Sequence, residues 1–166
     1  GMHKIEDRPM VVNGQIVISQ IFGGSGSNAS AANGDFLEIF NRSCVTVNLD
    51  GYSVQVATSA TSATPTWRVV PLPNFPLSPG QYYCVRLSTT TIGTAFIHDQ
   101  NATALVGDVL LSTSGKAALV LGDTALTGAC PPAASVVDFV VYAGTAGVCT
   151  EGNRITTVTG GATAAR

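Results

Sequence analysis

Apolar and polar residues alternate along several short segments of the chain, and this period of two is typical of β-strands with one buried face. Nowhere do apolar residues recur at helical spacing over three turns. We therefore expect an all-β fold with no helix longer than about two turns. The segments that predict strands are Gln15–Phe22, Phe36–Asn41, Val45–Leu49, Tyr52–Ala57, Trp67–Val70, Gln81–Leu87, Val109–Leu111, Ala117–Leu121 and Val136–Tyr142.

Turn and breaker residues separate these segments. Asp50-Gly51 is a strong turn dipeptide, and four prolines follow the Trp67–Val70 segment at positions that exclude helix and central strand. Short strands with turn signals about every ten residues are typical of a β-sandwich or a barrel. We expect residues 1–14 to be an N-terminal arm or a leftover linker, residues 15–158 to be one sandwich, and residues 159–166 to be a tail or linker.

Composition narrows the classes of function. The 166 residues suit one domain, and the net charge is −2 with no basic tract. Nucleic-acid binding needs a positive stripe that releases phosphate counterions, so this domain alone is not expected to bind nucleic acid. No apolar run approaches the roughly 20 residues of a membrane span, so none is expected.

Three acidic residues are candidates for a cation site: Asp35, Glu38 and Asp138. Calcium needs six or more oxygen ligands, which closely spaced acids often supply, and no D-x-D-x-D run exists here. Structural roles are therefore favoured, with Glu38 on a solvent-facing side of its strand and Asp138 bonded to a loop backbone. No cofactor or metal is expected.

Two motifs carry weak catalytic signals. His98-Asp99 pairs a base with a carboxylate, but no G-x-S-x-G nucleophile motif accompanies it, so a solvated loop histidine is favoured. Ser114-Gly115-Lys116 resembles a phosphate loop, but Ala117 follows where that motif needs Ser or Thr and then a helix. This favours a tight hairpin with Lys116 exposed. We expect no enzymatic activity.

Aromatic residues raise the alternative of a carbohydrate-binding module. In alternating strands, aromatic side chains more often fill the core than form a sugar platform. Tyr82 and Tyr83 must point to opposite faces, so only one of them can lie on a surface. The candidates are Tyr52, Trp67, Tyr82, Tyr83 and Tyr142.

The chain has four cysteines and no C-x-x-C pair, which disfavours a structural zinc site. An even cysteine count in a β protein of low charge favours an oxidising compartment. Cys44 and Cys84 both adjoin predicted strands. They either bridge or lie buried as free thiols, and the sequence leaves both alternatives open.

The order of motifs resembles a bacterial lamin tail domain over nearly the whole chain, from about Gln15 to Arg166. The motifs are I-V-I-S-Q-I-F-G-G at Ile16–Gly24, G-D-F-L-E-I-F-N-R at Gly34–Arg42, V-N-L-D-G-Y-S-V-Q at Val47–Gln55, a lone Trp67, L-S-P-G-Q-Y-Y-C-V at Leu77–Val85, S-G-K-A-A-L-V at Ser114–Val120 and S-V-V-D-F-V-V-Y-A-G at Ser135–Gly144.

This resemblance implies an immunoglobulin-like β-sandwich of two mostly antiparallel sheets without catalytic activity of its own. It implies a non-enzymatic accessory binding or anchoring module of a secreted or surface bacterial protein, whose partner is a protein or a surface polymer. A separate catalytic domain is an expected neighbour. The alternatives are a carbohydrate-binding module and an enzyme built on a sandwich scaffold.

The resemblance also favours a disulfide between Cys130 and Cys149, because similar bacterial domains place a cysteine on each side of the Val136–Tyr142 strand. That strand would separate its two ends by about 20 Å if it were straight. The flanking loops must therefore fold back to join the sulfurs, and their Gly and Pro content allows this.

Overall fold

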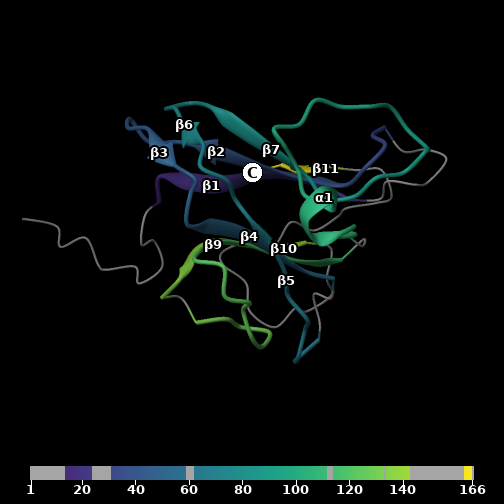
Figure 1. The fold of residues 1–166 in the computed structure, drawn as a ribbon. Coiled ribbons are helices and arrows are strands. Elements are labelled where there is room, and N and C mark those ends of the chain that lie inside the picture. Colours follow the sequence, from purple (N-terminus) through teal and green to yellow (C-terminus); the bar gives the residue numbers. More distant parts are fainter. Residues whose placement is uncertain are drawn as a thin grey trace, which may run out of the picture.

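The computed structural model describes residues 14–23, 31–58, 62–111, 114–132 and 134–142, and the backbone of 163–165. Two main sheets face each other as layers (Figure 1). The five-stranded sheet has the order β11-β1-β2-β7-β8, the four-stranded sheet has the order β10-β9-β4-β5, and β3 and β6 form a small third sheet. The elements are β1 (Ile16–Phe22), β2 (Phe36–Asn41), β3 (Val47–Asn48), β4 (Tyr52–Ala57), β5 (Arg68–Pro71), β6 (Pro76–Leu77), β7 (Tyr82–Arg86), β8 (Gln100–Asn101), α1 (Thr103–Val106), β9 (Gly115–Leu121), β10 (Val136–Tyr142) and β11 (Thr163–Ala165).

This architecture confirms the predicted all-β class. The named strands pair in antiparallel fashion except for the short parallel pair of β7 and β8. In the described part of the chain the only helix is the four-residue α1. The sandwich is therefore of two mostly antiparallel sheets, as the alternating pattern predicts.

Alternation along the strands builds the core between the layers. On β2, Leu37 and Ile39 are fully buried while Glu38 and Phe40 are partly exposed. On β4, Val54 and Val56 face them from the opposite sheet and belong to the same apolar cluster. Burying one such aliphatic side chain is worth about 1.5–3 kcal/mol, so burial of this inner layer is a large favourable contribution to folding.

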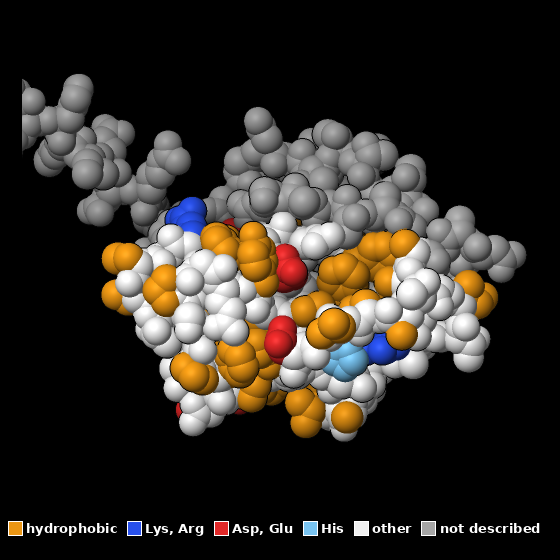
Figure 2. Space-filling model, turned by 90° about the horizontal axis from the view of Figure 1, so that it is seen from above, with side chains coloured by type: hydrophobic (Ala, Val, Ile, Leu, Met, Phe, Trp, Pro, Cys, Tyr) orange, Lys and Arg blue, Asp and Glu red, His pale blue; other side chains and the backbone are white. Residues whose placement is uncertain are grey.

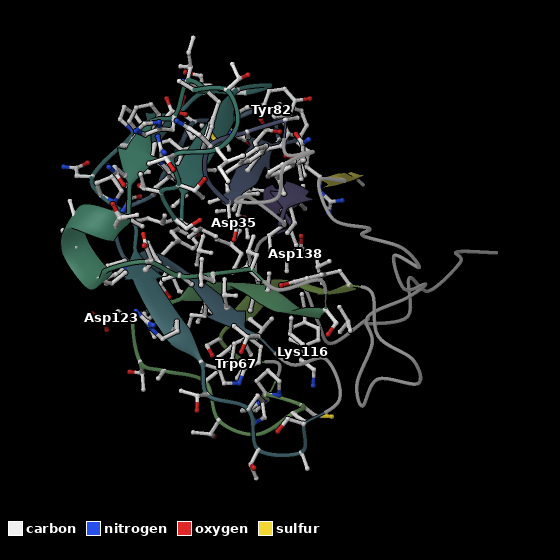
Figure 3. The ribbon with its side chains drawn as sticks, turned by 90° about the vertical axis from the view of Figure 1, so that its right-hand side faces the viewer. Asp35, Trp67, Tyr82, Lys116, Asp123 and Asp138 are labelled. Atoms are coloured by element: carbon white, nitrogen blue, oxygen red, sulfur yellow. The ribbon has the colours of Figure 1, made fainter. Side chains whose placement is uncertain are left out.

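Two buried carboxylates hold backbone groups inside the fold, and both lie between the layers (Figure 3). Asp138 of β10 accepts a 2.7 Å hydrogen bond from the amide of Ile18 on β1 and so connects the two sheets. It does this where β1 has a register shift, between Ile18 and Gln20. Asp35 accepts a 2.8 Å bond from the amide of Leu111. Asp138 therefore has a structural role, and this bond reaches a strand backbone where we predicted a loop backbone.

The prediction of a strand over Val45–Leu49 is only partly right, because β3 covers Val47–Asn48 alone. Val45 is 48% exposed, so it does not share the buried face of Val47 and Leu49. The reason is local polar bonding: the Asn41 side-chain amide donates to the carbonyl of Val45, and the Ser43 hydroxyl accepts from its amide. These bonds make a turn in place of a ladder.

Two other segments differ from expectation. Val109 and Leu111 are buried, but they line the core as an irregular segment, and their amides bond to the Leu87 carbonyl and the Asp35 carboxylate instead of a strand. Residues 159–166 were expected to be a tail or linker, yet Thr163–Ala165 pair with β1 as strand β11. Without β11, this side of β1 would be a sheet edge with free amide and carbonyl groups. Pairing with Thr163–Ala165 satisfies some of these groups.

Residues 122–132, here called the covering segment, lie over the outer face of the four-stranded sheet. Their Leu126 joins a second apolar cluster with Trp67 and Phe139 from that face. The indole N–H of Trp67 donates to the Gly128 carbonyl at 3.1 Å. The Gln55 side chain donates to the Thr124 carbonyl and accepts from the Leu126 amide. Side chains of the sheet thus satisfy the backbone of the covering segment, and this outer face is closed.

Candidate binding face

The outer face of the five-stranded sheet has a different character. We define the β2–β7 face as the outward side chains of β2 and β7 together with the segment that precedes β8. Its members are Phe36, Glu38, Phe40, Tyr82, Cys84, Phe96, His98 and Asp99. Each of these side chains is partly or largely exposed in the structure. Strand pairing places Phe40 opposite Tyr82 and Glu38 opposite Cys84, which fixes the rows of the face.

Aromatic rings occupy both ends of the face. At one end the rings of Phe40 and Tyr82 lie 4.5 Å apart with planes inclined by 33°, and Tyr82 is 53% exposed. At the other end Phe36 stacks on Phe22 at 5.2 Å and contacts Phe96 at 5.0 Å. Figure 2 looks onto this face and shows acidic side chains between groups of hydrophobic ones.

Two carboxylates and a thiol occupy the middle of the face. Asp99 accepts a 2.7 Å hydrogen bond from the backbone amide of Cys84, and Glu38 lies opposite Cys84 on β2. Burial, together with the negative charges of Glu38 and Asp99, raises the pKa of the Cys84 thiol to about 12. The thiol therefore stays protonated at neutral pH and is a poor nucleophile.

Arg86 lies on the same strand but does not neutralise these acids. It is only 9% exposed, and its guanidinium donates to the backbone carbonyls of Ser88 and Asn33. Its Cζ lies 5.1 Å from the centre of the Phe96 ring. The guanidinium thus packs over an aromatic ring of the face, and among the described residues it forms no ion pair with the two carboxylates.

The three residues considered as a cation site do not converge. Asp35 and Asp138 are buried between the sheets, whereas Glu38 lies on the β2–β7 face as predicted. Among the residues that the structure describes, no group of three His, Cys, Asp or Glu side chains is arranged to hold a metal ion.

The residues of the two weak catalytic motifs also do not form a catalytic arrangement. His98 Nδ1 lies 3.3 Å from the carbonyl oxygen of Phe96, while Asp99 binds the Cys84 amide, so the carboxylate does not orient the imidazole. Lys116 is fully buried in β9, and the prediction of an exposed Lys116 is wrong. Its ammonium donates to the Ala129 carbonyl in the covering segment, and burial lowers its pKa.

The aromatic residues divide as strand parity predicts. Tyr83 is 1% exposed and Tyr82 is on the surface, as Figure 3 also shows for Tyr82. Tyr52, Trp67 and Tyr142 belong to the two apolar clusters. Sequence reasoning missed Phe36, Phe40 and Phe96 as surface residues. The signal was present for two of them, because Phe36 and Phe40 share the parity of Glu38 on one strand.

The sequence left open whether Cys44 and Cys84 form a disulfide. Cys44 and Cys84 are free thiols, and Cys44 is exposed rather than buried. Cys149 lies outside the described residues, so the Cys130–Cys149 bridge stays a prediction.

One further hollow, of about 240 Å³, lies at the turn between β3 and β4. It is lined by Asp50, Gly51, Tyr52, Pro71, Leu72, Gly122 and Asp123. It offers carboxylates but no base paired with a nucleophile. Within the described ranges, no helix is long and apolar enough to cross a bilayer.

The layers, the closed outer face and the open outer face together define a β-sandwich module of immunoglobulin-like fold. The family model of the Lamin Tail Domain matches residues 10–159, which is most of the chain. The protein therefore belongs to the lamin tail domain family. No curated protein matches it.

Proposed function

We propose that this domain is a non-catalytic binding or anchoring module of a secreted or surface protein, and that the β2–β7 face contacts its ligand. The observation that carries the proposal is the contrast between the two outer faces. The covering segment closes one face with its own apolar cluster. The other face presents aromatic rings and carboxylates to solvent.

Three features support a binding role over an enzymatic one. The family has an immunoglobulin-like fold without catalytic activity of its own. The described residues contain no orienting carboxylate for His98, and the free thiol on the face has a raised pKa. Reaction chemistry needs a nucleophile, a base and a stabilising group that converge, and these residues do not.

A carbohydrate is the second candidate ligand, because the exposed ring of Tyr82 offers an apolar surface of the kind that sugar rings stack on. The inclination of 33° between Tyr82 and Phe40 argues against a flat platform for two sugar units. Nucleic acid is disfavoured because the middle of the face is acidic and would repel phosphates.

A binding panel tests the proposal. The purified domain would be offered to insoluble polysaccharides, to peptidoglycan and to peptides of positive, neutral and negative charge. We expect at least one ligand whose binding weakens about tenfold in Tyr82→Ser and Phe40→Ser, since aromatic anchors in interfaces contribute about 1–2 kcal/mol or more. Leu121→Ser is the control, because Leu121 is an exposed apolar residue on the other sheet.

Equal binding of every bound ligand by these variants and the parent domain would exclude the β2–β7 face. Turnover of DNA, phosphate esters or peptides that His98→Ala abolishes would overturn the non-catalytic role.

A further inference from the structure

The carboxylates of the β2–β7 face lack a cationic partner in the described part of the chain. Glu38 Oε1 accepts from the Ser19 hydroxyl at 2.8 Å, and Asp99 Oδ2 accepts from the Cys84 amide. The second oxygen of each carboxylate has no hydrogen-bond partner among the described residues. Since Arg86 is turned inward, two negative charges remain available to a ligand.

The spacing along β2 matches an extended chain. Phe36, Glu38 and Phe40 point outward at alternate positions, so neighbouring members are about 6.6 Å apart and the outer two about 13 Å apart. A single metal ion or a small amine covers only the middle of this row. An extended peptide presents its own side chains with the same period of two and covers the whole row.

We propose that the ligand of the β2–β7 face is an extended segment of a protein partner with the pattern apolar-x-basic-x-apolar. Its central lysine or arginine contacts Glu38 and Asp99. Its two apolar residues pack on the Phe40–Tyr82 pair and on the Phe36–Phe96 pair. This inference rests on the proposed function and adds the chemistry of the partner.

Charge complementarity favours this occupant over a neutral glycan. A basic side chain forms charge-assisted hydrogen bonds with free carboxylate oxygens. The aliphatic stem of lysine also lies against aromatic surface while its ammonium reaches an acid, and the ring faces attract the cation. A glycan would satisfy the oxygens with hydroxyls and gain nothing from the negative charge.

The test uses the whole chain and a fluorescein-labelled peptide with the core Leu-Ser-Lys-Ser-Leu, titrated by fluorescence anisotropy. We expect Glu38→Gln with Asp99→Asn to weaken binding about tenfold, through the loss of charge-assisted hydrogen bonds to the peptide lysine. The side-chain amide oxygens introduced at positions 38 and 99 still accept from Ser19 and Cys84, so this variant should keep its fold. An unchanged circular dichroism melting curve checks this.

Asp50→Asn with Asp123→Asn is the matched control. It changes the net charge equally, and both of these aspartates are exposed at the hollow beside β4, away from the β2–β7 face. We expect it to leave binding unchanged. Acetylation of the peptide lysine should weaken binding as much as the Glu38 and Asp99 changes do.

Equal binding of the acetylated peptide, equal loss in the control variant, or no binding of the lysine peptide would each overturn the inference. The proposed function survives such a result if another ligand of the panel depends on Tyr82 and Phe40. The proposed function itself fails if no ligand of the panel depends on Tyr82 and Phe40.

Discussion

At the scale of single residues, the pKa of the Cys84 thiol depends on burial and on the two negative charges of the β2–β7 face. A thiol pKa raised from 9.0 to about 12 leaves about a thousandfold less thiolate at pH 8. We therefore predict that iodoacetamide modifies exposed Cys44 at least about tenfold faster than Cys84 at pH 8. Peptide mass spectrometry of samples quenched over time measures both rates.

The same experiment tests the cause of the raised pKa. The Cys84 rate should rise as the pH approaches 12, since a raised pKa keeps the thiol neutral until then. It should also rise at fixed pH in the Glu38→Gln, Asp99→Asn variant, because removal of two negative charges lowers the thiol pKa. Equal rates for Cys44 and Cys84 at pH 8 would contradict the described environment.

Gly115 is a second residue for which the structure predicts the effect of a substitution. A Cβ at this position would collide with the Tyr142 hydroxyl oxygen and would lie 2.6 Å from the Ala57 carbonyl oxygen. We predict that Gly115→Ala lowers the free energy of unfolding by about 1–3 kcal/mol through overpacking. Urea denaturation followed by tryptophan fluorescence measures it. A change below about 0.5 kcal/mol, the usual range of surface substitutions, would show that the contact is looser than described.

At the scale of elements, the covering segment depends on polar side chains of the sheet beneath it. Gln55 is fully buried and satisfies both the Thr124 carbonyl and the Leu126 amide. We predict that Gln55→Ala lowers the free energy of unfolding by about 1–3 kcal/mol, because the buried Leu126 amide and the partly buried Thr124 carbonyl lose their partner. Thr127→Ala, an exposed change in the same segment, is the control.

Hydrogen exchange shows whether the destabilisation by Gln55→Ala is confined to the covering segment. Faster exchange of the Leu126 amide in Gln55→Ala, with unchanged exchange in β2, places the damage in the covering segment. Unchanged exchange at Leu126 would mean that Gln55 does not hold the segment.

The predicted Cys130–Cys149 bridge belongs to the same scale, since Cys130 follows directly on Ala129, whose carbonyl binds Lys116 of the sheet. We predict a cross-linked peptide in a non-reduced digest of protein made under oxidising conditions. In the chain-entropy account, a loop of this size contributes about 3 kcal/mol. A free thiol at Cys149 would refute the bridge and weaken the argument for an extracellular setting.

Much of the strand pattern was predictable from the sequence. The limits of β2, β4 and β10 are those that alternation or β-branched runs predict. Alternation also predicted that only one of Tyr82 and Tyr83 lies on the surface. Where prediction failed, a distant polar partner decided the outcome. Lys116 is buried because a carbonyl of the covering segment accepts a hydrogen bond from its ammonium, and no local pattern reveals that bond.

The candidate site was less predictable than the fold. Alternation places Phe36, Glu38 and Phe40 on one side of β2, but it does not say which outer face another segment will cover. The covering segment has no periodic pattern that would predict its position, and hydrogen bonds with the side chains of Trp67 and Gln55 anchor it there. The open face therefore emerges only from three-dimensional packing.

At the scale of the whole molecule, the two sheets have different roles. The four-stranded sheet carries the covering segment and a second apolar cluster, while the five-stranded sheet presents an acidic middle between aromatic ends. On the proposed function, the open face binds a ligand while the closed face contributes to stability. The proposed function depends on this division more than on any single residue.

An amide chemical-shift map of the ¹⁵N-labelled domain, titrated with the Leu-Ser-Lys-Ser-Leu peptide, examines both outer faces in one experiment. We predict shifts that cluster at Phe36–Asn41 and Tyr82–Arg86, with little change in residues 122–132. Shifts confined to the covering segment or to the hollow beside Asp123 would contradict the division between a binding sheet and a stabilising one.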